Sequence, residues 1–188
     1  MEADWEFEVG PDAPVIDAAW AGLVDLRREP HRANALPEAA LLPALAEALA
    51  TLNSSASSVW TSKCAFWTQL EACDFDPDEL DAPPGHAACA TGCYIDLLPG
   101  DERPWRQPET AAIECKQLCT RLRAIPLRCC RTDLVIRRAF LQNTTADEPA
   151  SFGITAYLTA CGETQTQAAQ QLSDALAAFA DAFVSTQR

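Results

Sequence analysis

Charged side chains alternate with apolar ones in residues 131–140, RTDLVIRRAF. Because successive side chains of a β-strand point to opposite faces, this spacing predicts a strand with one apolar face and one face that carries Arg131, Asp133 and Arg137. Tyrosines and carboxylates recur with the same period in two other predicted strands. Side by side in a sheet, these strands would present one polar row: Tyr94, Asp96, Arg131, Asp133, Arg137, Thr155 and Tyr157.

This polar row carries the chemistry of recognition. A guanidinium group binds carboxylates with a planar fork, and Tyr and Arg are enriched where protein partners bind most tightly. Three interpretations are open: a solvated sheet face, an interaction face for a protein partner or a second copy of the chain, and a catalytic site of unknown class. If the row is an interaction face, replacing Arg131 and Arg137 by glutamate is expected to abolish partner capture and to leave folding intact.

A second set of candidates lies in the segment HAACATGC, which contains His86, Cys89 and Cys93. Imidazole nitrogens and thiolates are ligands of zinc, so a metal- or thiol-dependent protein that uses this loop is the alternative function. Cys115 and Cys119 could add to such a set, but they fall on or beside the apolar stripe of a predicted helix. We expect them to be buried core residues.

The acidic segment DFDPDELD has carboxylates at alternating positions, as at the start of a calcium-binding loop. Glu79 occupies the sixth position, where that loop needs glycine, and Gly85 occupies the twelfth, where it needs glutamate. We therefore expect a solvated acidic loop that is available to pair with the arginine-rich segment 103–138. The seven glycines form no phosphate-binding loop, so a nucleotide enzyme is not predicted.

The net charge of −13 is carried by the first half of the chain. Residues 1–100 contain 17 acidic and 4 basic side chains, whereas residues 101–188 contain ten of each. Such a negative field repels nucleic acid and anionic lipid, so neither is expected as a partner. No apolar run is long enough to span a membrane. The expected partner is therefore a protein, or a second copy of the chain.

Cysteine usage indicates the compartment. The nine cysteines are an odd number, and the acidic N-terminal segment lacks the layout of a secretory signal. Thiols stay reduced in the cytoplasm, whereas disulfide frameworks belong to exported proteins. We therefore expect a cytoplasmic protein with free thiols, and no cofactor apart from the zinc ion of the alternative function.

The elements that must position these residues follow from hydrophobic periodicity and from breakers. Helices are predicted over residues 11–28, 38–53, 108–125 and 164–184, and strands over residues 57–67, 93–100, 128–141 and 151–162. The order α-α-β-β-α-β-β-α predicts an α+β fold, with an antiparallel sheet of about four strands covered on one face by helices. Residues 1–12 are expected to form an acidic mobile tail, and residues 13–188 a single domain with a long loop at about 71–92.

This order of elements, with the acidic composition, is similar to that of small acidic chaperones that serve bacterial secretion systems. Those proteins have a helix, a hairpin-rich sheet and a closing amphipathic helix, here predicted at residues 164–184, and they act as homodimers. The resemblance implies a chaperone-like binder of other proteins. With the polar row it leads to the functional prediction of a non-catalytic cytoplasmic adaptor or chaperone-like homodimer that uses an open polar sheet face.

Overall fold

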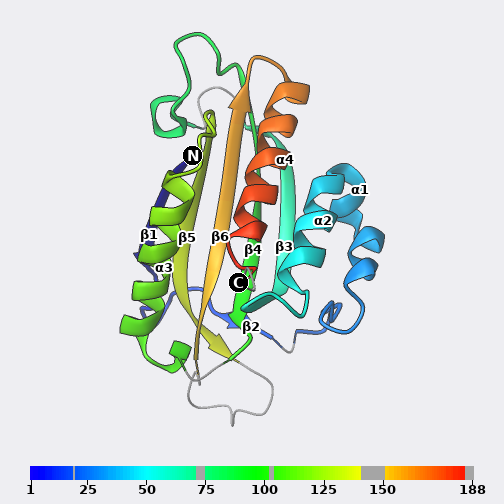
Figure 1. Ribbon diagram of the computed structural model, residues 1–188, viewed down its shortest axis with the longest axis vertical. Helices are drawn as coiled ribbons and strands as arrows, with labels where there is room; N and C mark the ends of the chain where they lie inside the picture. The colour runs from blue at the N-terminus through cyan, green and yellow to red at the C-terminus, as the bar shows by residue number, and fades with distance from the viewer. Residues whose placement is uncertain (19, 71–74, 102–103, 141–150, 185–188) are drawn as a thin grey trace.

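The computed structural model describes residues 1–18, 20–70, 75–101, 104–140 and 151–184. It is an α+β fold, as predicted, in which helices cover one face of a mixed sheet of six strands (Figure 1). The strands are β1 (Glu2–Phe7), β2 (Ile16–Asp17), β3 (Val59–Leu70), β4 (Cys89–Pro99), β5 (Cys130–Phe140) and β6 (Ser151–Gly162). The helices are α1 (Pro37–Leu41), α2 (Pro43–Leu52), α3 (Pro108–Arg123) and α4 (Gln165–Asp181), with short 3₁₀ turns at Pro30–Ala35, Asp78–Leu80 and Pro104–Arg106.

Five strands lie in the order β1-β5-β6-β4-β3, and β2 also pairs with β5. The pairs β3 with β4, β4 with β6 and β5 with β6 are antiparallel, so the four predicted strands and the predicted pairing of β5 with β6 are confirmed. The prediction of a four-stranded, wholly antiparallel sheet is wrong at one edge, because β1 and β2 both run parallel to β5.

Strand β1 stands where a mobile tail was expected over residues 1–12. Its side chains alternate: Ala3 is buried and Trp5 packs against the core, whereas the three carboxylates of the strand are exposed. This is the period of a strand, and the backbone of β5 supplies its partner, with Glu2 opposite Arg131. Acidic composition therefore does not make the segment a tail, because a strand edge is available to hold it.

The helix expected over residues 11–28 is wrong, because this segment contains β2 and turns. Two of its apolar side chains are buried on the sheet face opposite to the helices, in a cluster formed by Ile16, Ala18, Trp60, Leu98 and Ala139. Two prolines and Gly22 interrupt the segment. A β-carbon on Gly22 would lie only 1.9 Å from the Trp20 ring, so the backbone passes directly against that indole. The apolar residues attach the chain to the sheet rather than forming a helical stripe.

The helix expected over residues 38–53 is split in two before Pro43, which is the first residue of α2. Proline suits this position because the first amide of a helix has no intrahelical partner. Helices α3 and α4 match their predictions. Half of the predicted capping box of α4 is formed, because the Gln167 amide donates to Thr164 Oγ1 at 3.2 Å. The Gln167 side chain accepts from the amide of Glu163 at 3.0 Å, one residue before the N-cap residue Thr164.

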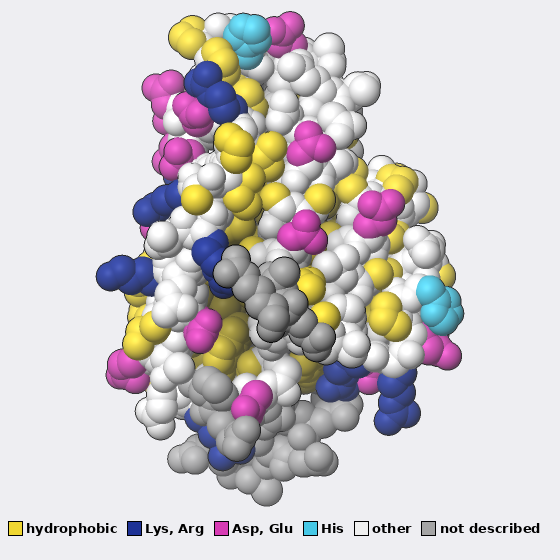
Figure 2. Space-filling model, viewed as in Figure 1, with side chains coloured by type: hydrophobic (Ala, Val, Ile, Leu, Met, Phe, Trp, Pro, Cys, Tyr) yellow, Lys and Arg dark blue, Asp and Glu magenta, His cyan; other side chains and the backbone are white. Residues whose placement is uncertain are grey.

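The main core lies between the sheet and the helices. Leu172, Leu176 and Phe179 of α4 belong to it together with Ile95 of β4 and Leu134 of β5. Apolar side chains are visible on this side in the groove between α3 and α4 (Figure 2). A cavity of about 530 Å³ at the end of α4 lies along this groove, and only two of its lining side chains are charged. No helix in the described part of the chain combines the length and apolarity that a membrane crossing requires.

Two segments cover the ends of the sheet face opposite to the helices, which we call the open face. At one end, Leu80 and Ala82 pack against Ala90 and Cys161, and we call residues 75–88 the loop cover. At the other end lies the cluster around Ile16 and Ala18, which we call the β2 cover. Strand β4 begins at Cys89, so the loop expected at about 71–92 ends earlier than predicted.

Candidate functional site

The six residues predicted to bind a partner all lie on the open face, between the loop cover and the β2 cover. β4 carries two of them, β5 three and β6 one, and the register brings Tyr94, Tyr157 and Asp133 opposite one another across three strands. With Thr155 they form what we call the polar band: Tyr94, Asp96, Arg131, Asp133, Arg137, Thr155 and Tyr157. The alternation of side chains was therefore sufficient to place them together.

Arg137 is the most connected residue of the polar band. Its Nε and Nη2 donate to Glu8 Oε2 at 3.1 and 2.6 Å, its Nη1 donates to Thr155 Oγ1 at 3.3 Å, and its Nη2 also donates to the Tyr157 hydroxyl at 3.2 Å. Only 13% of the side chain is exposed. These bonds of the guanidinium are all to groups of the same chain, and they connect β5 to Glu8 and to β6. Sequence analysis missed Glu8, whose contact depends on the pairing of β1 with β5.

Asp96 is a buried carboxylate at the centre of the polar band, with 7% of its surface exposed. Thr155 Oγ1 donates to Asp96 Oδ1 at 2.6 Å. Burial raises the pKa of Asp96 above its ordinary value, and the Thr155 hydrogen bond and the charges of Arg137 and Lys63 oppose this shift only in part. Ionised Asp96 is therefore less favourable in the folded chain than in the unfolded chain.

Replacing Asp96 by asparagine is expected to raise the melting temperature at pH 7. Between the ordinary pKa of Asp and its raised value in the folded protein, the folded state binds more protons than the unfolded state, so stability falls as pH rises. Asparagine still offers an oxygen to the Thr155 hydroxyl, and because it does not ionise, it removes this loss of stability. The gain should shrink as the pH is lowered towards the ordinary pKa, as measured by thermal melts across this range. Asp174→Asn, an exposed change in α4, is the control, and a lower melting temperature for Asp96→Asn at pH 7 would contradict the prediction.

Arg131 and Asp133 form an ion pair within β5, in which Arg131 Nε donates to Asp133 Oδ1 at 2.7 Å. Burial raises the pKa of Asp133, while the hydrogen bond and charge of Arg131 act in the opposite direction. Arg131 also lies 3.9 Å from Glu79 of the loop cover, and Arg128 is paired with Asp81 of the same cover at 2.9 Å. The expected pairing of the acidic loop with the arginine-rich segment is therefore confirmed at these two contacts.

Three aromatic side chains from neighbouring strands border the carboxylates. The Tyr94 and Tyr157 rings are tilted, with centroids 6.0 Å apart, and both side chains are half-buried. Burial, followed by the charge of Asp96, raises the pKa of the Tyr94 hydroxyl. Trp67 of β3 lies across Gly92, where a β-carbon would come within 2.7 Å of the indole. Trp67 was not among the predicted site residues. The strand pattern could have placed it there, because Trp67 lies two residues after Ala65 and therefore on the same face, and Ala65 is opposite Tyr94.

An acidic notch lies beside the polar band, between β1 and β5. It is a cavity of about 190 Å³ lined by Asp4, Trp5, Glu6, Arg131, Asp133 and Leu134. Three of these side chains are carboxylates and one is a guanidinium, so the notch suits a cationic group better than an anionic one. The Arg137 guanidinium already lies over the Tyr157 ring, 5.8 Å from its centroid, which shows that this surface can hold a cation against a ring face.

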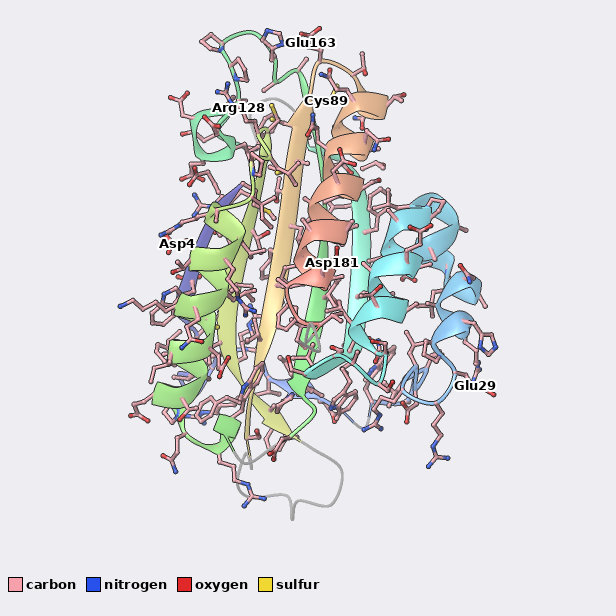
Figure 3. The ribbon with its side chains drawn as sticks, in the orientation of Figure 1. Asp4, Glu29, Cys89, Arg128, Glu163 and Asp181 are labelled. Carbon is pink, nitrogen blue, oxygen red and sulfur yellow. The ribbon has the colours of Figure 1, made fainter. Side chains whose placement is uncertain are left out.

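The three predicted zinc ligands are not brought together. Cys93 is fully buried in the main core, whereas His86 forms an ion pair with Glu163 at the end of the sheet. Cys89 lies at that same end, with its thiol 3.9 Å from the Glu163 carbonyl oxygen (Figure 3). Cys89 and Cys93 are four positions apart in β4, which corresponds to about 13 Å along an extended strand. Within the described ranges no group of three His, Cys, Asp or Glu side chains could hold a metal ion.

The remaining predicted core cysteines are where they were expected. Cys115 and Cys119 are buried on the sheet side of α3, at 0% and 3% exposure. Burial raises the pKa of both thiols, to about 12 for Cys115 and about 11 for Cys119, so neither is a thiolate at neutral pH.

The fold and the polar band define an α+β protein with a helix-covered sheet and a polar, aromatic surface on its other face. No model of a protein family, no curated protein and no solved structure matches this chain. Its function is therefore argued from the chemistry of the open face.

Proposed function

We propose that this chain is a non-catalytic cytoplasmic adaptor or chaperone-like protein that binds a basic polypeptide segment on its open face. The observation that carries this proposal is the half-exposed row of Tyr94, Tyr157 and Asp133, which lies between two covers and beside the acidic notch. Aromatic faces next to carboxylates attract lysine and arginine side chains, and such rings bury apolar area at little entropic cost.

Charge selects the partner. Each arginine of the band is paired with one carboxylate, Arg137 with Glu8 and Arg131 with Asp133, so these two pairs carry no net charge. The exposed carboxylates of β1 add further negative charge at the same edge. An acidic partner would be repelled, whereas a basic segment gains both attraction and faster encounter. A second copy of the chain would place one acidic surface against another, so a basic partner is favoured over self-association.

The proposal predicts selective binding of basic peptides. The probes are three fluorescent peptides of equal length and apolar content, one lysine-rich, one neutral and one glutamate-rich, titrated with the full chain and followed by fluorescence anisotropy. The lysine-rich peptide should bind most tightly, and added salt should weaken its binding. Asp133→Asn should weaken this binding about fivefold, because one carboxylate of the notch is lost.

Glu114→Gln is the matched control, because it removes one exposed carboxylate on α3, on the other side of the sheet. Equal effects of the two substitutions, or equal binding of the glutamate-rich peptide, would refute the basic-segment proposal. Analytical sedimentation of the same samples tests whether a second copy of the chain occupies the open face instead. A doubled mass that Asp133→Asn abolishes would refute a basic partner and assign the open face to a second copy.

A further inference from the structure

Two cysteines face each other where β5 begins and β6 ends. The Cys161 amide donates to the Cys129 carbonyl oxygen at 2.9 Å, and the next pair along the ladder is Cys130 with Ala160. A complete hydrogen-bonded antiparallel pair exchanges two such bonds and has its Cα atoms about 5.5 Å apart. The bond from Cys161 to Cys129 is one of these two, so it places the two residues opposite each other at about this separation. This separation is within the range that a disulfide spans.

Both side chains belong to the cluster around Leu80 and Ala82, but their surroundings differ. Cys161 is fully buried against Leu80 and Ala82 of the loop cover, and burial raises its pKa to about 12. Cys129 is half-exposed, so an oxidant in solution can reach it. Its φ angle is +60°, a left-handed conformation that side-chain-bearing residues rarely adopt and that is found disproportionately at functional positions.

We propose that Cys129 and Cys161 form a peroxide-sensitive thiol pair, a modification site at which a hydroperoxide converts two thiols into a disulfide beneath the loop cover. This site is independent of the proposed peptide-binding surface, because neither cysteine belongs to the polar band. It lies at the end of the sheet where Arg128 and Cys89 are also found (Figure 3).

The reaction needs no group beyond the two cysteines and the hydroperoxide. The half-exposed Cys129 thiol gives its proton to solvent, and its sulfur attacks one peroxide oxygen, so that an S–O bond forms and the O–O bond breaks. The oxygen that leaves takes up a proton from solvent and departs as an alcohol, or as water when the oxidant is hydrogen peroxide. The Cys161 sulfur then attacks the sulfenic sulfur of Cys129. An S–S bond forms, the S–O bond breaks, and water leaves with the Cys161 proton. The two thiols lose two electrons, and the hydroperoxide is reduced by two.

The other neighbouring cysteines in the described part of the chain lack this geometry. Cys64 and Cys93 lie on the same sheet face, but Cys64 is opposite Ile95, so the two are diagonal neighbours about 7 Å apart at Cβ. Cys115 and Cys119 lie one turn apart on α3 and are buried in the main core. The proposal therefore predicts that hydrogen peroxide oxidises one pair selectively.

The test treats the folded full chain with hydrogen peroxide, blocks the remaining thiols by alkylation, and maps the peptides by mass spectrometry. The expected product has lost two hydrogens and contains a Cys129–Cys161 linked peptide that dithiothreitol separates. Cys129→Ser should leave Cys161 reduced. Cys161→Ala should leave a sulfenic acid on Cys129 that dimedone labels. Cys115→Ala is the control and should still form the link.

Three outcomes would overturn the proposal: alkylation of both Cys129 and Cys161 after oxidation, a link from Cys129 to Cys130 or Cys73, or unchanged oxidation of Cys161 in Cys129→Ser. Cys129→Ser still tests the proposal if Cys161→Ala unfolds. Because Cys129 is half-exposed, its substitution removes no buried side chain.

Discussion

Replacing Arg137 by glutamate is expected to lower the free energy of unfolding by about 2 kcal/mol, because a guanidinium that is only 13% exposed loses its hydrogen bonds, although its partner Glu8 is 43% exposed and partly screened by solvent. The substitution removes the bonds to Glu8, Thr155 and Tyr157 and places a new carboxylate beside Glu8 and near the buried Asp96. Urea unfolding followed by tryptophan fluorescence measures the change. The burial of Arg137 leads us to expect a less stable variant, whereas the sequence alone led us to expect that replacing Arg131 and Arg137 by glutamate leaves folding intact.

Exchanging the two charges separates the contribution of the Arg137–Glu8 ion pair from the other effects of the Arg137→Glu substitution. Glu8→Arg combined with Arg137→Glu should recover part of the lost stability, because the two side chains can pair again with exchanged charges. Lys116→Glu, which makes the same change of charge at an exposed position of α3, is the matched control and should be within about 0.5 kcal/mol of the original chain. Equal unfolding free energies for Arg137→Glu and Lys116→Glu would show that the Arg137 contacts contribute nothing to stability.

Replacing Asn53 by alanine is expected to cost about 2–3 kcal/mol of stability, since buried polar groups are left without partners. Asn53 Nδ2 donates to Thr61 Oγ1 at 2.7 Å and to the Leu49 carbonyl at 2.8 Å, and its Oδ1 accepts from the Thr61 amide at 3.1 Å. These bonds fasten the end of α2 to β3. Thermal and urea unfolding should both report the loss.

A double-mutant cycle with Thr61→Val isolates this contact. The two substitutions together should cost less than the sum of the single changes, because each alone strands the partner of the other. Asn34→Ala is the matched control, since Asn34 is exposed and donates only to the His31 carbonyl. Strict additivity of the two buried changes would mean that Asn53 and Thr61 are not coupled.

Local sequence patterns were sufficient to predict the strands that pair with the next strand along the chain. The alternation in residues 131–137 and 151–161 fixes which side chains face the helices, and it placed the polar band correctly. The capping residues of α4 likewise act within one turn. The parallel pairing of β1 with β5 could not be predicted in this way, because its partner lies more than a hundred residues away and no local period indicates it.

The sequence predicted that the residues of the polar band share one sheet face, but it did not predict their contacts. Arg137 resembled a residue that grips a partner, yet its fork is occupied by Glu8, which only the folded sheet brings close. His86, Cys89 and Cys93 are near in sequence, but strand geometry sends Cys93 into the core and leaves the others at the end of the sheet. Ligands that are close in sequence can bind one metal ion only where the backbone turns between them, and Cys89 and Cys93 lie on one extended strand.

The position of β1 at the edge of the sheet determines the order in which the molecule can assemble. Its residues are synthesised well before those of β5, since Glu8 and Arg137 are 129 residues apart in the sequence. The hairpin of β5 with β6 closes over a short connection, so it can form early, whereas β1 must wait for a partner made much later. Until then β5 is an unprotected strand edge in a folding intermediate, open to pairing with other chains. The N-terminal strand therefore ends the period in which the nascent protein is most prone to aggregate.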